Sequence, residues 1–156
     1  SDTSQQALNI QSKRMASESG KHTQVLLDSE KPLTEQLNGF DNILCWDALC
    51  YNQLAKAKAD SRDLMKLLAA GGYLFVNMPT MRHEFATTGR LLEDGSFENR
   101  RVGTRQEGAI MSIPENLDEL VSWFKGLEIV ESGHFTFDFA GFREFMFLVG
   151  RKAIAE

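Results

Sequence analysis

The sequence predicts an α/β fold in which an open, mostly parallel sheet ends in an antiparallel pair of strands. Three observations lead to this class. Apolar segments of strand length alternate with amphipathic segments of helical period. Residues 72–79, "GYLFVNMP", are continuously apolar, as in a strand that is covered on both faces. The last two strand-like segments, 127–137 and 143–152, are joined by too few residues for a crossover helix, so they should pair antiparallel.

Length and charge narrow the class of protein. The chain fits a single domain, 1–156, and its net charge of −5 argues against a nucleic acid or an anionic membrane as the main partner. No apolar run reaches the roughly 18 residues of a membrane span, and the start carries no signal-peptide pattern. Cys45 and Cys50 make a poor disulfide framework, which predicts a cytoplasmic protein. The three histidines are scattered, so no metal site is predicted.

The amino-terminal third predicts one helix and two strands. Residues 1–20 have a helical pattern, with Thr3 and Gln6 as a capping box and Gly20 as the stop. Residues 23–28, "TQVLLD", form a short buried strand in this interpretation. A loop with one helical turn follows, and then a second strand, "DNILCWD", over 41–47.

The middle of the chain predicts a helix, the central strand and an insertion. Residues 59–72 have the clearest helix ending, with Ser61 as the cap and Gly71 as the left-handed exit. The strand at 72–79 is stopped by Pro79. Residues 81–112 lose this periodicity and are expected to form a loop or lid, with an Asp94-Gly95 hairpin signal inside it.

Regular structure resumes towards the carboxyl terminus. Residues 116–126 predict a helix that is capped by Asn116 with Glu119 and that ends at Gly126. The two final strands carry phenylalanines at alternate positions, which we interpret as core or as a dimer face. In open α/β sheets the ligand crevice lies beyond the carboxyl ends of the strands. The ends that matter here are at 28–29, 45–47 and 77–79.

Several segments, taken in order, resemble the class I S-adenosylmethionine-dependent methyltransferases. Residues 1–15, "SDTSQQALNIQSKRM", resemble the family's second strand end and next helix, and 25–33, "VLLDSEKPL", its third strand and acidic turn. Residues 40–52, "FDNILCWDALCYN", resemble the fourth strand, and 64–79 the helix, Gly-Gly turn and fifth strand. The closing antiparallel pair resembles the sixth and seventh. This resemblance implies S-adenosylmethionine as cofactor and methyl transfer to an unidentified small-molecule acceptor.

The resemblance also implies residues that face the cofactor. Asp2 matches the acidic residue that accepts from the ribose hydroxyls, although a terminal residue or a helix cap is the simpler role. Asp28, with the backbone of Ser29, matches the position that accepts from the adenine amino group, and a turn former is the alternative. Cys45 and Trp46 match the strand end that lies along the cofactor, and ordinary core packing is the alternative.

A second group is expected to face the acceptor. Asp47 and Tyr51 follow the fourth strand of the family, and Asn77 ends the fifth, where substrate passes. Arg101 forms a basic cluster with Arg90, Arg100 and Arg105 that can bind an anionic group, although a solvated loop is the commoner explanation. Methyl transfer mainly requires alignment, and a base only where the acceptor must lose a proton. His83 is the candidate for that base, with an exposed loop histidine as the alternative.

One departure from the family pattern shapes the functional expectation. The family's first strand and glycine-rich loop are missing, and the sequence contains no Gly-x-Gly. We therefore expect the chain by itself to bind the cofactor poorly, either as a fragment of a longer enzyme or as a fold closed by a second copy through unpaired strand edges. The alternative is a degenerate methyltransferase-like module that acts in protein–protein interaction. A domain for another nucleotide is disfavoured by the lack of any phosphate-binding loop.

Overall fold

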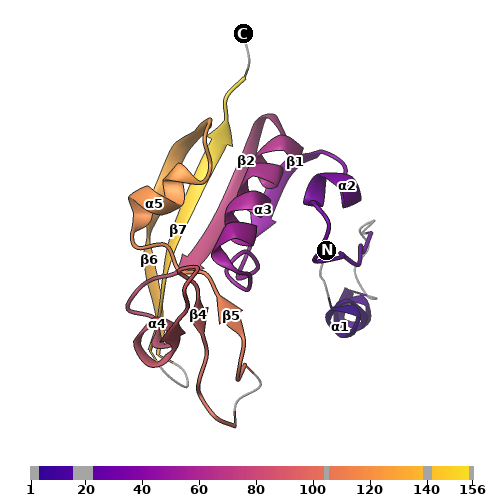
Figure 1. The fold of residues 1–156 in the computed structure, drawn as a ribbon. Helices are drawn as coiled ribbons and strands as arrows, with labels where there is room; N and C mark the ends of the chain where they lie inside the picture. The colour runs from indigo at the N-terminus through magenta and orange to yellow at the C-terminus, as the bar shows by residue number, and fades with distance from the viewer. Residues whose placement is uncertain (1–3, 16–22, 104–105, 139–141, 155–156) are drawn as a thin grey trace.

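The chain folds around a four-stranded sheet. The computed structural model describes residues 4–15, 23–103, 106–138 and 142–154. The strand order is β1-β2-β7-β6 (Figure 1). Strands β1 and β2 are parallel, and β7 is antiparallel to both β2 and β6, so β1, β2 and β6 share one direction. The predicted fold class and the closing antiparallel pair are confirmed. The bounds are Phe40–Cys45 for β1, Leu68–Pro79 for β2, Leu127–Asp138 for β6 and Phe142–Lys152 for β7.

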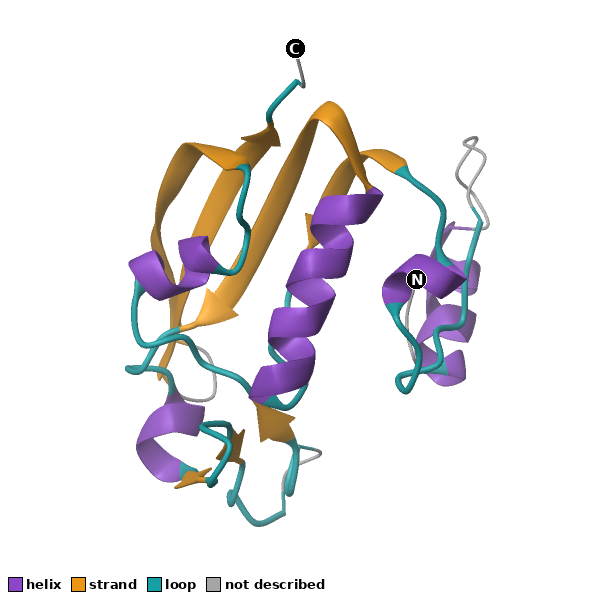
Figure 2. Cartoon of the chain, turned by 45° about the horizontal axis from the view of Figure 1, so that its top comes forward, coloured by secondary structure: helices purple, strands orange, loops and turns teal. Residues whose placement is uncertain are grey.

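Two helices cover one face of this sheet. Helices α3 (Leu54–Leu67) and α5 (Leu117–Ser122) lie on the same side of the sheet (Figure 2). Alternate side chains of the central strand β2 point towards them, and Leu74, Val76 and Met78 are fully buried there. These side chains belong to the hydrophobic core. The expectation that this strand is covered on both faces is wrong, because the described helices cover one face only and Tyr73 on the other face is 45% exposed.

No described helix covers the other face of the sheet (Figures 1 and 2). Leu44 on β1 is 72% exposed, and Tyr73 on β2 is 45% exposed. The β1 edge away from β2 pairs with no strand in the part of the chain that the structure describes. We call the apolar residues on this side the open face; they are Leu44, Trp46, Tyr73, Phe75, Phe135, Phe137 and Phe147.

The prediction for the start of α3 is wrong. The helix begins at Leu54, and Ser61 lies inside it, buried, with its hydroxyl donating to the carbonyl of Ala57 at 2.8 Å. Serine is tolerated within a helix when it bonds to the carbonyl four residues earlier. The alanines and lysines at 55–58 are strong helix formers and extend the helix.

The predicted helix exit at Gly71 is wrong as well. The helix ends at Leu67, and Gly71 lies in β2 with a φ of 77°. The left-handed conformation lies instead where the pairing of β1 with β2 changes register. Phe40 pairs with Leu68, whereas Asn42, two residues later, pairs with Tyr73. At the neighbouring Gly72, an added Cβ would lie 2.2 Å from the carbonyl oxygen of Asp41.

The predicted strand at 23–28 is also wrong. Among its described residues only Leu26 forms a bridge, and its side chain is 50% exposed. A strand needs a continuous ladder partner, and the described chain places none beside this segment. The helical turn that follows is confirmed as α2, Leu33–Gln36.

The amino-terminal helix is confirmed as α1, Gln5–Met15. Its cap is Ser4, whose hydroxyl accepts from the N–H of Ala7 at 3.2 Å. The predicted capping residue Thr3, the stop at Gly20 and the candidate Asp2 lie outside the described residues.

The insertion lies at the carboxyl end of β2 (Figure 1). It contains α4 (Glu84–Thr88) and a small antiparallel sheet of β3 (Arg90–Leu91), β4 (Phe97–Glu98) and β5 (Ile110–Met111). The hairpin signal is confirmed, since Gly95 has a φ of 85° and Asp94 accepts from the N–H of Ser96 at 3.0 Å. The Asn116 cap of α5 is confirmed too, because its side chain accepts from the N–H of Glu119 at 2.9 Å.

Candidate ligand site at the carboxyl ends of β1 and β2

The site is organised by a polar pair at the ends of two neighbouring strands. Asp47 lies just after β1, and Asn77 lies near the end of β2 and is fully buried. The Asn77 side-chain oxygen accepts from the Asp47 N–H at 2.8 Å, and its amide donates to the Asp47 carboxylate. Asp47 has a φ of 46°, a left-handed conformation that aspartate tolerates better than most residues. The pair therefore fixes the turn at the strand end and leaves acceptor positions on the carboxylate for a ligand.

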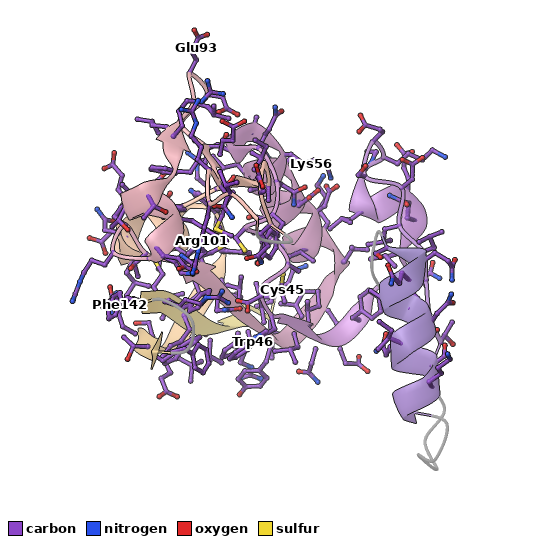
Figure 3. All side chains as sticks on the ribbon, turned by 90° about the horizontal axis from the view of Figure 1, so that it is seen from below. Cys45, Trp46, Lys56, Glu93, Arg101 and Phe142 are labelled. Carbon is purple, nitrogen blue, oxygen red and sulfur yellow. The ribbon has the colours of Figure 1, made fainter. Side chains whose placement is uncertain are left out.

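Cys45 and Trp46 point to opposite faces of the sheet (Figure 3). Cys45 is buried on the side of α3, and burial raises the pKa of its thiol to about 11. Burial raises the pKa of the Cys50 thiol as well. Since the thiolate is the nucleophile, neither cysteine is suited to nucleophilic chemistry near neutral pH.

Trp46 forms part of the open face. Its ring stacks on Phe75, with centroids 5.6 Å apart and an interplanar angle of 9°. It also stacks on Phe135 of β6, at 5.5 Å and 20°. The indole is 47% exposed, so it offers a flat apolar surface beside Asp47.

Tyr51 connects the loop after β1 to the insertion. Its hydroxyl accepts from the side chain of Gln106 at 2.9 Å, and burial raises its pKa to about 12, so the hydroxyl stays protonated. Two further hydrogen bonds join Ser112, which follows β5, to the loop that contains Tyr51. The N–H of Ser112 donates to the backbone carbonyl of Cys50 at 2.8 Å, and its hydroxyl donates to the backbone carbonyl of Asn52 at 2.6 Å. The insertion is thus held against the strand end that carries Asp47.

Arg101 lies in an ion-pair cluster at the same end. Glu84 pairs with Arg101 at 2.9 Å and with Arg143 of β7 at 3.1 Å. Two further cluster members, Arg90 and Arg100, both pair with Glu98. An anionic ligand at Arg101 has to compete with the carboxylate of Glu84. The fourth predicted member of this basic cluster, Arg105, lies outside the described residues.

His83 is buried and caps α4. Its Nδ1 accepts from the N–H of Phe85 at 3.1 Å, and its ring lies between Phe85 and Phe145 with centroids 5.0 and 5.1 Å away. Burial lowers its pKa to about 4, so the imidazole is neutral near pH 7. Since Nδ1 accepts, Nε2 carries the proton, and the ring has no second lone pair with which to act as a base. This geometry favours a helix-capping role.

Asp28 and Ser29 lie in an exposed turn. The Asp28 carboxylate accepts from the N–H of Glu30 at 3.0 Å and pairs with Lys31 at 3.5 Å. These bonds are those of a turn former, the alternative role of Asp28. Neither of them links Asp28 to the residues at the end of β1.

The structure thus brings together Cys45, Trp46, Asp47, Tyr51 and Asn77, and it links Arg101 to β7 through Glu84. Sequence reasoning missed the roles of Gln106 and Ser112, because long-range loop contacts leave no local pattern. Among the described residues no group of three or more His, Cys, Asp or Glu side chains is placed to hold a metal ion. None of the described helices is long and apolar enough to cross a bilayer.

Comparison with known proteins identifies the fold. No protein-family model and no curated protein matches the sequence. A solved S-adenosylmethionine-dependent methyltransferase from Methanosarcina mazei matches 99% of this chain and 81% of its own, with a TM-score of 0.76 and 16% identity. The N-methyltransferase NodS from Bradyrhizobium japonicum matches 97% of this chain and 71% of its own, with a TM-score of 0.62 and 18% identity.

A third match gives the same fold in a longer protein. TehB from Haemophilus influenzae matches 96% of this chain, which spans 48% of TehB, with a TM-score of 0.64 and 13% identity. The chain therefore has the class I methyltransferase fold, and the fold implied by the sequence motifs is confirmed.

Proposed function

We propose that the chain provides the acceptor-facing part of an S-adenosylmethionine-dependent methyl transfer to a small molecule. The observation that carries this proposal is the Asp47–Asn77 pair, which lies where open α/β sheets bind their ligands. The solved neighbours support the type of reaction, since they are methyltransferases, and NodS has been solved with S-adenosylhomocysteine. A cytoplasmic location, predicted from cysteine usage, belongs to the same proposal.

The residues present fit the cofactor on one side. Asp47 keeps acceptor positions, Trp46 offers a flat surface, and Asp28 carries an exposed carboxylate before α2. The side chain of Cys45 is in the core, so only its backbone is available to a ligand. The sequence has no Gly-x-Gly, the pattern by which such folds bring backbone N–H groups close to a nucleotide. When bound, the cofactor supplies an electrophilic methyl group on a sulfonium.

The chain's own residues then act by positioning. The Asp47 carboxylate accepts from a hydroxyl or amine of the acceptor, and Asn77 holds that carboxylate in place. The protonated hydroxyl of Tyr51 can donate to an oxygen of the same molecule. The insertion, tied down through Ser112 and Gln106, limits the access of water to this end of the sheet.

Methyl transfer is tested with a labelled methyl group. The protein is incubated with S-adenosylmethionine labelled in its methyl group and with fractionated small molecules. At a cofactor concentration high enough to offset weak binding, label transfer should occur and should fall about tenfold or more in Asp47→Asn, because the neutral amide cannot replace the charge of the carboxylate. The matched control is Glu93→Gln, which removes the same charge from an exposed position at the β3–β4 turn. Equal rates in the two variants would contradict the role of Asp47.

Cofactor binding is tested separately by calorimetric titration. We expect S-adenosylmethionine to bind the chain weakly, since the sequence has no Gly-x-Gly to approach its methionine end. Tight binding to the 156-residue chain would overturn this expectation.

A second candidate function is a protein-binding module, which the open face favours. Large apolar patches on a soluble protein mark interaction surfaces, and the unpaired β1 edge can accept a further strand. We propose a second copy of the chain as the partner. Sedimentation should show a dimer that Leu44→Lys dissociates, because Leu44 is 72% exposed on β1. A wild-type monomer at high concentration would exclude the dimer.

A further inference from the structure

A separate groove lies between α3 and α5, on the helix-covered face of the sheet. It has a volume of about 390 Å³, which is within the usual range of small-ligand sites. The open face and Trp46 belong to the opposite side of the sheet, so the proposed acceptor site does not explain this groove. Its lining consists of Lys58, Arg62, Met65, Ser122, Trp123 and Lys125.

The lining is strongly basic in a protein whose net charge is −5. Lys58, Arg62 and Lys125 line it, and no carboxylate does. Lys58 pairs with Glu119 at 3.0 Å. Arg62 and Lys125 form no ion pair within the described parts of the chain, and both are exposed. Most other basic side chains in this region are neutralised, as Lys56 is by Asp60 and Lys66 by Asp63.

The wall of the groove holds its cations in place. Trp123 is only 6% exposed, and the ammonium of Lys58 lies 5.4 Å from the centre of its ring. Burial acts to raise the pKa of Glu119, but the N–H of Glu115, Lys58 and the indole of Trp123 outweigh it and lower that pKa. Glu119 thus stays ionised and anchors Lys58 over the indole.

The indole N–H of Trp123 is the one buried side-chain donor or acceptor of the described residues without a hydrogen bond. It interacts with the carboxylate of Glu119 and lowers the pKa of that group. The indole N–H is shielded from the groove, because its nitrogen is buried. The cations Lys58, Arg62 and Lys125 are therefore the groups of the groove that are available to a ligand.

We propose that this groove binds a phosphate group of a small soluble molecule. A phosphate monoester carries close to two negative charges at neutral pH and three acceptor oxygens. These match the charge left by Lys58, Arg62 and Lys125 after Glu119 is subtracted. The guanidinium of Arg62 suits a bidentate contact with such oxygens, and the ammonium groups of Lys58 and Lys125 can donate to the remaining oxygen. A single carboxylate would neutralise only part of this charge.

The test uses inorganic pyrophosphate as the probe, titrated by calorimetry into the whole chain at constant ionic strength. Wild type should bind, and Arg62→Gln/Lys125→Gln should bind about tenfold more weakly or worse, because two charge-assisted contacts are lost. The matched control is Lys31→Gln/Lys66→Gln, which removes the same charge from exposed positions outside the groove. Its affinity should stay within about twofold of wild type.

A second readout reports on the groove itself. In a Trp46→Phe background the only remaining indole is Trp123, so its fluorescence should change on titration with pyrophosphate. Circular dichroism checks that each variant is folded. Absence of binding to wild type, or equal weakening in the groove and control variants, overturns the proposal.

One further arm identifies the source of the phosphate group. Flotation with vesicles that contain phosphatidate tests a lipid headgroup. Binding of pyrophosphate without vesicle binding supports a soluble ligand. Arg62-dependent vesicle binding without pyrophosphate binding overturns the soluble source.

Discussion

The Asp47–Asn77 pair gives the sharpest test of the site, through the substitution Asn77→Leu. Leucine keeps the branched shape and the number of side-chain heavy atoms of asparagine but removes both hydrogen bonds to Asp47. The bond that accepts from the Asp47 N–H contributes about 1 kcal/mol, and the one to its carboxylate about 1.5–3 kcal/mol. Asp47 is only half-buried, so hydrogen bonds to water can replace part of the lost free energy. We therefore expect the free energy of unfolding to fall by about 2–3 kcal/mol.

Urea denaturation followed by circular dichroism measures this change. For a chain of this length the loss corresponds to a fall in Tm of about 5–10 °C. A double-mutant cycle with Asp47→Asn measures the interaction free energy between the two side chains apart from the other effects of each substitution. Asp47→Asn suits the cycle because it leaves the backbone N–H in place and because asparagine also tolerates a positive φ. A loss below about 0.5 kcal/mol in Asn77→Leu would refute the reasoning. So would additive effects in the cycle.

Three further predictions concern His83, Gly72 and the cysteines. The pKa of His83 is lowered to about 4 in the folded chain, whereas the ordinary value is near 6.5. Between these two values the unfolded chain binds more protons than the folded chain, so the free energy of unfolding should fall as pH falls through this window. We expect a loss of about 1–2 kcal/mol at pH 5. In His83→Asn, which keeps a capping acceptor, urea titrations should show this pH dependence reduced, and an unchanged profile would contradict the assignment. Gly72→Ala should lower the free energy of unfolding by about 1–3 kcal/mol, since its Cβ would lie 2.2 Å from the Asp41 carbonyl. Gly39→Ala is the control, with an added Cβ 3.4 Å from its nearest neighbour, and equal losses in both would argue against the close approach. Burial raises the pKa of both thiols, so iodoacetamide should label neither Cys45 nor Cys50 in the native protein near pH 7, which mass spectrometry can check; rapid labelling would show that they are accessible.

Local signals in the sequence predicted much of the fold. The Asn116 cap and the Asp94-Gly95 hairpin are short patterns with one physical solution each, and both are confirmed. Parallel strands end at the same edge of a sheet, which predicts that Asp47 lies near Asn77. The hydrogen bonds between the two residues confirm this. The functional roles assigned to these residues stay predictions.

The failures have physical causes that a single sequence hides. Serine can cap a helix, or it can lie inside one and donate to a backbone carbonyl of the preceding turn. Ser61 does the latter, because the alanines and lysines before it favour the helix and extend it. The segment 23–28 has strand-like residues, but a strand depends on a partner that local composition does not specify. The hydrogen bond between Gln106 and Tyr51 joins two loops that are far apart in the sequence, and no local pattern of residues predicts it.

The strand order has a consequence for biosynthesis. Strand β2 lies between β1, which is made before it, and β7, which is made only after the insertion, α5 and β6. During translation the β7-facing edge of this very apolar strand therefore stays without its partner until all of these elements have been made. The nascent chain is exposed to misassembly for that interval, and shielding by a chaperone should improve its yield. Only three residues separate β6 from β7 in the sequence, so this hairpin forms quickly and the exposure ends soon after β7 has been made.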